Sequence, residues 1–322
     1  MAKPWSAELE LVGAGGEPVD LVRTLNSHGF ADLPPLRPAP DHRSMEITLA
    51  VRRGRPRTVR IEPAMRRAAR ITVLGPRVSA GALAELERAV EHSLRLDADL
   101  SDFYAAAADD PDLAWVTTGA GRMLRSATVF EDVVKTICTT NCAWSATVRM
   151  VTALVEHLGE RAPGATADGP LGRAFPSPGA MATADEAFYK EVVRAGYRGA
   201  YLRALAASAA DGSVDLEELA ASKSPDLPDD EVAARLLALP GVGPYAAAHV
   251  MMLLGRYSRL ILDSWTRPTY AKVTAARKPV ADRTIERRFR RYGRYAGLAF
   301  WLVLTRSWVA EEGPAARASA PA

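Results

Sequence analysis

Cysteine is scarce in this sequence: the 322 residues include two cysteines, Cys138 and Cys142. An iron–sulfur cluster needs about four thiolate ligands, so this count excludes such a cluster. Because the two cysteines lie four residues apart, we expect them on one helix, as small buried hydrophobic residues rather than as a disulfide. No group of histidines and cysteines has the spacing of a zinc site either. We therefore expect a protein without metal or cofactor.

Long apolar runs and a strong net charge are also missing. No apolar run approaches the length of a membrane span, and the N-terminus lacks the basic-then-apolar pattern of a signal peptide. These absences predict a cytoplasmic protein with no membrane partner. The net charge of +3 at pH 7 is too small to indicate a polyanionic partner by itself. A nucleic-acid surface would need local clusters of basic residues.

The most informative segment is Leu-Pro-Gly-Val-Gly-Pro-Tyr at positions 239–245, together with the acid Asp263 that follows it. A helix predicted over residues 231–238 ends here, because proline cannot continue the hydrogen-bond ladder and Gly241 accepts left-handed geometry. A second apolar helix begins near Pro244, since proline is welcome in a first turn. Such a hairpin exposes backbone amides at a helix N-terminus, which is a natural site for a phosphate.

This hairpin, its apolar helix and the following acid resemble the helix-hairpin-helix (HhH-GPD) superfamily of DNA glycosylases. The resemblance implies that Gly241, Val242 and Gly243 hold a DNA backbone phosphate and that Asp263 is the catalytic carboxylate. It also implies duplex DNA with a modified base as the partner of a monomeric enzyme, near the nucleoid if the source is bacterial. An ordinary turn between helices, with Asp263 only capping the second, accounts for the same residues.

Residues 1–98 have the pattern of an antiparallel β-rich subdomain. Apolar and polar residues alternate over 45–51 and over 58–61, which predicts a hairpin around the turn at 52–56. A further strand is expected over 70–74, a helix over 81–96 and a short helical turn over 20–25. Five arginines of this region either contact DNA or protect a solvated sheet edge from aggregation: Arg52, Arg53, Arg55, Arg57 and Arg60.

The rest of the chain predicts helices and loops. We expect an α+β fold, mainly α, with the N-terminal antiparallel β subdomain followed by a helical HhH-GPD glycosylase domain over residues 99–312. Residues 313–322 are expected to form a disordered tail. The resemblance covers about Leu96 to Trp308 and is weak before that.

Two further segments resemble the 8-oxoguanine glycosylase branch of this superfamily. Ile-Cys-Thr-Thr-Asn at 137–141 matches a motif whose asparagine enters the gap left by a flipped nucleotide, which implies this role for Asn141. Gly-Tyr-Arg at 196–198 matches a segment in which the tyrosine wedges into the base stack. The same role is implied for Tyr197, with Arg198 meeting a phosphate or a base edge. A mid-helix Asn141, a core Tyr197 and a solvated Arg198 are the structural alternatives.

The sequence departs from this branch where the chemistry is decided. The branch has a lysine two residues after the second hairpin glycine, which attacks the sugar and supports strand cleavage, whereas this chain has Tyr245. A phenol cannot form a Schiff base, so the resemblance implies hydrolysis with Asp263 as the catalytic carboxylate. Tyr245 is the second candidate catalytic residue: it either positions the water or packs on the sugar, or it only fills the space of the lysine. Two alternatives remain: a bifunctional glycosylase/lyase that uses another amine, and a non-enzymatic protein that binds DNA structure.

The residues expected around the excised base do not identify the lesion. Local alignment places Phe300 and Leu304 where the 8-oxoguanine branch has residues that read the base. His249 lies four residues after Tyr245, on the same face of its predicted helix. Trp265 and Trp301 either sandwich the base or belong to the core, and His249 either reads the base or is a core histidine.

Basic residues gather after Asp263. Between Lys272 and Tyr295 the chain has nine lysines and arginines against Asp282 and Glu286, a balance of +7 in a chain of net charge +3. This segment is the best electrostatic candidate for phosphate contact, although a solvated helix face explains any single arginine. Arg267, in the helix expected to start after Asp263, is a further candidate for DNA binding.

Overall fold

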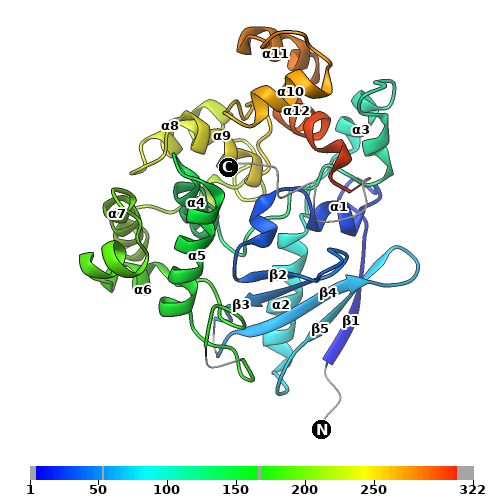
Figure 1. The fold of residues 1–322 in the computed structure, drawn as a ribbon. Coiled ribbons are helices and arrows are strands. Elements are labelled where there is room, and N and C mark those ends of the chain that lie inside the picture. The colour runs from blue at the N-terminus through cyan, green and yellow to red at the C-terminus, as the bar shows by residue number, and fades with distance from the viewer. Residues whose placement is uncertain (1–4, 53, 166–167, 310–322) are drawn as a thin grey trace.

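The N-terminal part of the chain forms one antiparallel sheet. The computed structural model describes residues 5–52, 54–165 and 168–309. Five strands lie in the order β1-β5-β4-β3-β2 (Figure 1). Their bounds are Trp5–Glu10 (β1), Leu36–Pro38 (β2), Met45–Leu49 (β3), Arg57–Pro63 (β4) and Ala68–Val73 (β5). The predicted hairpin is confirmed as β3 and β4, with Met45 opposite Ile61.

The apolar face of this sheet forms a core with helix α2 (Ala80–Ser93). Ile47, Val59 and Ile71 come from three neighbouring strands and are fully buried in one cluster with Leu86 and Val90 of α2. Alternation along each strand places these side chains on one face, and helical spacing does the same on α2. The expected helix over 81–96 is therefore confirmed, although it ends a turn earlier.

The arginines of the predicted hairpin do not protect a sheet edge. Strand β4 is hydrogen-bonded to both β3 and β5, so the edge strands are β2 and β1, and β1 was not expected from the sequence. Arg60 donates to Glu46 on β3, with 2.7 Å between Nη2 and Oε1. Arg55 donates to the carbonyl of Arg161 at 3.1 Å, and Arg53 lies outside the described residues. DNA contact by the hairpin arginines stays a prediction.

Helices make up most of the rest of the molecule. Besides α2, they are α1 (Leu21–Leu25), η1 (Gly29–Asp32), α3 (Ser101–Ala107), η2 (Ala114–Thr118), α4 (Val129–Thr139), α5 (Trp144–Leu158), α6 (Pro178–Thr183), η3 (Phe188–Val192), α7 (Arg198–Ala210), η4 (Glu217–Leu219), α8 (Asp229–Leu237), α9 (Pro244–Leu253), α10 (Thr266–Val273), α11 (Asp282–Phe289), η5 (Arg290–Tyr295), α12 (Ala296–Thr305) and η6 (Arg306–Trp308). None of the helices in the described ranges is both long and apolar enough to cross a bilayer. The mainly helical α+β fold is confirmed.

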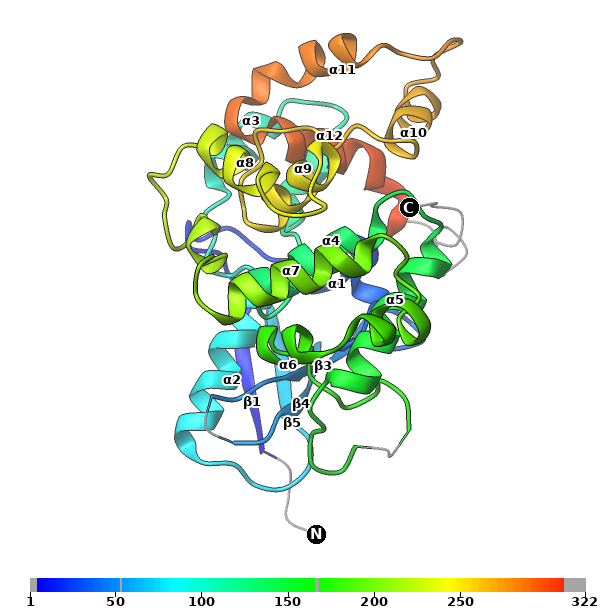
Figure 2. The same cartoon turned by 90° about the vertical axis from the view of Figure 1, so that its left-hand side faces the viewer.

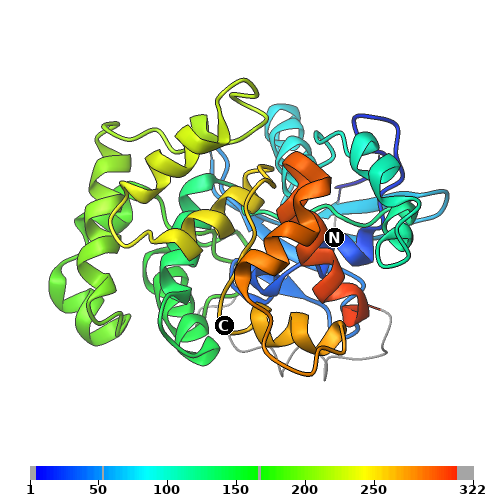
Figure 3. The same cartoon turned by 90° about the horizontal axis from the view of Figure 1, so that it is seen from above.

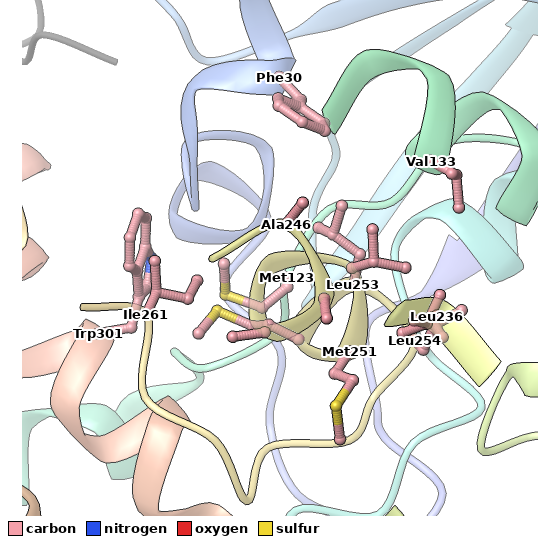
Figure 4. Packing of buried hydrophobic residues seen from close by; sticks show 14 of the residues in the cluster. Phe30, Met123, Val133, Leu236, Ala246, Met251, Leu253, Leu254, Ile261 and Trp301 are labelled. Atoms are coloured by element: carbon pink, nitrogen blue, oxygen red, sulfur yellow. The ribbon is translucent and has the colours of Figure 1, made fainter. Parts of the chain in front are cut away.

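A second, larger core holds the helical part together. Every residue of α4 and α12 is buried, as is α9 from Ala246 to its end, because these helices are packed on all sides. Figure 4 shows Ala246 and Leu253 of α9 in this cluster, with Val133 of α4 and with Phe30, which belongs to the N-terminal segment η1. Figures 1 and 2 show α8 to α12 above the sheet and α5 and α6 at about its level, and Figure 3 shows α12 beside the N-terminal segment that holds α1.

The expectation that the two cysteines share a helix is wrong. Helix α4 ends at Thr139, so Cys138 lies inside it and is buried, whereas Cys142 lies in the turn before α5 and is half-buried. The helix ends because Thr140 is extended and the Thr139 and Thr140 hydroxyls donate back to carbonyls of the last turn. Asn141 follows with a positive φ of 48°, so it is a turn residue rather than a mid-helix one.

Helix α4 also buries a titratable group away from the surface. Asp132 is completely buried, and its Oδ1 accepts a hydrogen bond from the Ser126 amide at 3.1 Å. Burial raises the pKa of Asp132 to about 7, with Glu131 adding to the effect and Lys135 opposing it. Lys135 is itself paired with Glu131, at 2.7 Å between Nζ and Oε1.

We expect Asp132→Asn to stabilise the protein at high pH. An unfolded aspartate has a pKa of about 3.9, so the folded protein binds an extra proton between pH 4 and 7. The free energy of unfolding of the wild type therefore falls as the pH rises through this range. Asparagine keeps the Oδ1 acceptor and removes the buried charge, so the variant should gain roughly 1–3 kcal/mol at pH 8 and little at pH 4. Urea unfolding at both pH values measures this; parallel losses of stability would contradict it.

Candidate active site

The hairpin between α8 and α9 has two glycines with different requirements. Gly241 has a φ of 79°, and a Cβ there would lie 2.7 Å from Cδ2 of Tyr201, so this position needs glycine. Gly243 has an ordinary φ of −95°, and no atom lies within 4 Å of where its Cβ would be. Gly241 is therefore needed for the turn itself, whereas the lack of a side chain at Gly243 leaves the space in front of α9 open.

The first turn of α9 presents amides to this open space. Its first main-chain bond runs from the Ala247 amide to the Gly243 carbonyl at 2.9 Å, so the amides of Tyr245 and Ala246 lie before the ladder begins. The amide of Val242 instead donates to the Leu239 carbonyl at 3.2 Å, inside the hairpin. An anion at Gly243 would therefore meet the helix N-terminus rather than the Val242 amide.

A surface groove runs from the hairpin to the turn between α4 and α5. Its lining includes the hairpin glycines, Asn141, Tyr197 and Asp263. The Asn141 Nδ2 donates to the Tyr197 hydroxyl at 3.3 Å, and Tyr197 is 55% exposed. The structure therefore brings together residues that lie more than one hundred positions apart in the sequence, as the resemblance implies.

Arg198 does not reach into this groove. The residue is buried, and its guanidinium donates to the carbonyl of Thr140, with 3.0 Å from Nε. The same guanidinium lies over the ring of Tyr197, 4.6 Å from its centroid. The geometry differs from the expected contact with a phosphate or a base edge: Arg198 holds the turn that carries Asn141 beside the exposed tyrosine.

A cavity adjoins the groove and shares Thr139, Tyr245 and Asp263 with it. Three of the residues expected around the base, His249, Trp265 and Trp301, line this cavity. Figure 4 shows Trp301 beside Ile261, another lining residue, below Phe30. The remaining lining residues were not expected from the sequence: His28, Gly29, Phe30, Asp32, Trp144, Ile261 and Trp308, together with Thr139.

Asp263 is held at the start of α10 by a reciprocal cap. Its Oδ1 accepts from the amides of Trp265 at 2.8 Å and Thr266 at 2.6 Å, and its own amide donates to the Thr266 hydroxyl at 2.8 Å. Oδ2 receives no hydrogen bond from the described side chains or amides. One carboxylate oxygen thus fixes the orientation, while the group lines both the cavity and the groove.

Two other polar groups of the cavity, Tyr245 and His249, are neutral at physiological pH. Burial raises the pKa of Tyr245 to about 12, and its hydroxyl lies 3.5 Å from that of Thr139. Burial lowers the pKa of His249 to about 4. The His249 ring stacks on Phe30, with 4.9 Å between centroids and 28° between planes. Neither group supplies a charge, so Asp263 is the charged group shared by the cavity and the groove.

Phe300 and Leu304 do not line this cavity. Phe300 is fully buried against Phe289 and Tyr270, at centroid distances of 5.4 and 5.9 Å. Leu304 lines a different hollow, which it shares with Arg288. Trp301 faces the cavity instead, because one position along a helix turns the side chain by about 100°. The helix α12 is present as expected, but the local alignment assigned the wrong face of it to the cavity.

Three of the nine basic residues between Lys272 and Tyr295 are paired with acids. Arg288 and Arg291 pair with Asp112 and Asp110, and Arg294 pairs with Asp102 on α3 at 2.8 Å. Arg267 donates to both carboxylate oxygens of Asp282, at 2.8 and 2.9 Å. Six other basic residues of the segment have no ion pair with a described carboxylate: Lys272, Arg277, Lys278, Arg283, Arg287 and Arg290. DNA contact by Arg267 and by this segment stays a prediction.

Solved structures of DNA glycosylases share this architecture over nearly the whole chain. A 3-methyladenine DNA-glycosylase from Archaeoglobus fulgidus is 19% identical, with a TM-score of 0.69, and the match covers 95% of this chain and 99% of that one. MBOgg1 in complex with a low-affinity DNA ligand is 18% identical, with a TM-score of 0.71 and coverages of 96% and 98%. The chain has the same fold as these DNA glycosylases.

A third structure extends the likeness to a DNA complex. The Clostridium acetobutylicum 8-oxoguanine glycosylase/lyase, bound to double-stranded DNA with cytosine opposite 8-oxoG, is 19% identical with a TM-score of 0.61. The match covers 88% of this chain and 92% of that one. No family model matches the sequence, and a search of curated proteins finds no match. At these identities the likeness shows the fold alone.

Proposed function

We propose that this chain is a monofunctional DNA glycosylase, which hydrolyses the N-glycosidic bond of a damaged or modified base flipped out of duplex DNA. The observation that carries the proposal is the meeting of the groove and the cavity at Asp263. Solved structures of the same fold include glycosylases in complex with DNA. The groove suits a DNA strand, and the aromatic cavity behind it suits one extruded base.

The groove and the cavity together have a place for each part of a duplex with one flipped-out nucleotide. The helix N-terminus beside Gly243 accepts a backbone phosphate. The exposed Tyr197 and its partner Asn141 stand at the other end of the groove, where they fill the gap left in the duplex. The extruded nucleotide passes Tyr245 and Asp263 and places its base in the cavity.

Asp263 supplies the charge that the reaction needs. As the bond between the sugar C1′ and the base nitrogen breaks, its electron pair leaves with the base and positive charge develops on the sugar. The Asp263 carboxylate, oriented through Oδ1, stabilises this charge with Oδ2. The oxygen of a water molecule then bonds to C1′, and its proton passes through the carboxylate to solvent or to the departed base.

The residues around the sugar support hydrolysis rather than lyase chemistry. Among the described residues, neither a lysine nor an arginine lines the cavity or the groove. The phenol of Tyr245, with its pKa near 12, is a poor nucleophile at neutral pH and cannot form an imine. Lys135 is buried in α4 and paired with Glu131, so it is held away from the groove.

We expect the wild-type enzyme to leave intact abasic strands. A screen of duplexes with different modified bases should yield strand breaks only after heating in alkali, and borohydride should trap no covalent complex on the enzyme. Tyr245→Lys is the complementary variant, because it restores an amine at the position of the lyase lysine. Efficient nicking or trapping by the wild type would instead establish a bifunctional glycosylase, and binding without base release from any duplex would establish a non-enzymatic DNA-binding protein.

A further inference from the structure

An exposed tyrosine of α7 lies between the two ends of the groove. Tyr201 is 38% exposed and lines the groove together with Tyr197 and Gly241. It lies one helical turn after Tyr197, so the two side chains project from the same face of the helix. The Tyr201 hydroxyl has no hydrogen bond with any residue that the structure describes. Its ring, rather than its hydroxyl, therefore makes the contacts of this side chain.

On one side, Tyr201 packs directly on the hairpin. A Cβ on Gly241 would lie 2.7 Å from Cδ2 of Tyr201 and 3.1 Å from its Cβ and Cγ. The backbone of the hairpin is therefore in close contact with this side chain along its length. Such contacts have little compressibility, so they fix how far the hairpin stands from α7.

On the other side, Tyr201 contacts the exposed ring of Tyr197. The two ring centroids lie 5.9 Å apart with 75° between the planes, an edge-to-face arrangement that aromatic pairs favour. Asn141 and Arg198 hold the same ring from other directions, through the 3.3 Å hydrogen bond and the cation–π contact described above. Tyr201 is the neighbour that joins this ring to the hairpin.

We propose that Tyr201 is a positioning residue for base extrusion, which fixes the Tyr197 ring at a set distance from the phosphate site before α9. The inference rests on the proposed glycosylase function and deepens it. When a phosphate is held at Gly243, the step of the base stack that a ring can enter depends on the distance between ring and phosphate. A ring that is already ordered also loses less conformational freedom when it inserts.

This role predicts where the loss of Tyr201 is felt. Tyr201 acts through Tyr197, so its removal should impair unstacking of the duplex. Contact of the hairpin with phosphates and the chemistry at Asp263 do not involve the ring of Tyr201. Affinity for an unmodified duplex should therefore be nearly unchanged, which separates positioning from a general loss of DNA binding.

The probe is a duplex with a tetrahydrofuran abasic site and with 2-aminopurine beside the base opposite that site. Insertion of the Tyr197 ring unstacks 2-aminopurine, so its fluorescence should rise when the wild type binds. We expect Tyr201→Ala to reduce this rise by about threefold or more at saturation, with the Kd for an unmodified duplex within about twofold of the wild type. Tyr201→Phe keeps the ring and should match the wild type.

Two further variants guard against a purely structural effect. Leu237→Ala is the matched control, because Leu237 is 45% exposed on α8 and does not line the groove, and it should leave the fluorescence rise unchanged. Tyr201→Leu keeps apolar bulk against the hairpin and replaces Tyr201→Ala if thermal unfolding shows that alanine destabilises the fold. Without an aromatic edge, it should show the same reduced rise.

A double-mutant cycle tests whether Tyr201 acts through Tyr197. Tyr197→Ala should weaken binding to the abasic duplex, and adding Tyr201→Ala should weaken it no further. Additive losses, a full rise in Tyr201→Ala, a reduced rise in Tyr201→Phe, or no rise with the wild type would each overturn the inference. Base release is a separate measurement: a protein that shows the expected rises but releases no base supports the role of Tyr201 and contradicts the proposed hydrolysis.

Discussion

Asp263→Asn should reduce base release by on the order of 100-fold or more, because the main electrostatic stabiliser of the developing positive charge is lost. The variant should fold normally. An asparagine Oδ1 accepts the same hydrogen bonds from the amides of Trp265 and Thr266, so the start of α10 is preserved. Affinity for duplex DNA should stay the same or increase, since a negative charge near phosphates is removed. Single-turnover release and equilibrium binding on the same duplex measure the two effects.

Asp263→Ala separates the carboxylate's two tasks. Alanine removes both the charge and the cap, so this variant should lose activity and also stability, by about 1 kcal/mol for the lost cap. Asp263→Asn should lose activity alone. If Asp263→Asn turned over within about tenfold of the wild type, the residue would be a helix cap and not the catalytic group.

Gly243→Asp should weaken DNA binding for every sequence and every lesion alike. The new side chain has room, because no atom lies within 4 Å of its Cβ position and φ is ordinary, so the variant should fold. Its carboxylate then occupies the space in front of the α9 amides and repels a phosphate there. We expect a loss of affinity of about tenfold or more and a shallower dependence on salt, by about one phosphate contact.

Two variants control for this effect. Gly243→Ala adds a Cβ without charge and should cost less affinity than Gly243→Asp. Gly241→Ala should instead destabilise the fold, because its φ of 79° and the ring of Tyr201 at 2.7 Å leave no room for a side chain. Unchanged affinity in a folded Gly243→Asp variant would show that the hairpin is only a turn between two helices.

Features specified by neighbouring residues were predictable from the sequence. The hairpin glycines, the helix that starts at Pro244 and the alternation of β3 and β4 all depend on local geometry, and each lies where expected. The end of α4 depends on hydroxyl back-bonds in its last turn, which the pattern of residue types did not indicate. Cys142 and Asn141 were therefore expected on a helix that ends before them.

The cavity was predictable only in part, because long-range packing builds it. Tyr245, His249 and Asp263 follow from the hairpin, but the wall from His28 to Asp32 belongs to a segment with no signal that linked it to the others. Predicting which face of α12 lines the cavity requires an alignment accurate to one residue. The local alignment selected Phe300, whereas Trp301 lines the cavity.

A hydrogen bond links the cavity wall on α12 to the N-terminal segment: the Trp301 indole N–H donates to the carbonyl of Ser27 at 2.9 Å. Ser27 precedes η1 near the sheet core, and Trp301 belongs to the helical core. A ligand held between these walls binds the folded state and not a state in which the N-terminal segment has parted from α12. By mass action, ligand at 100 times its Kd would add about 2.7 kcal/mol to the work of parting them. Ligand binding in the cavity and the stability of the folded state are thus thermodynamically linked.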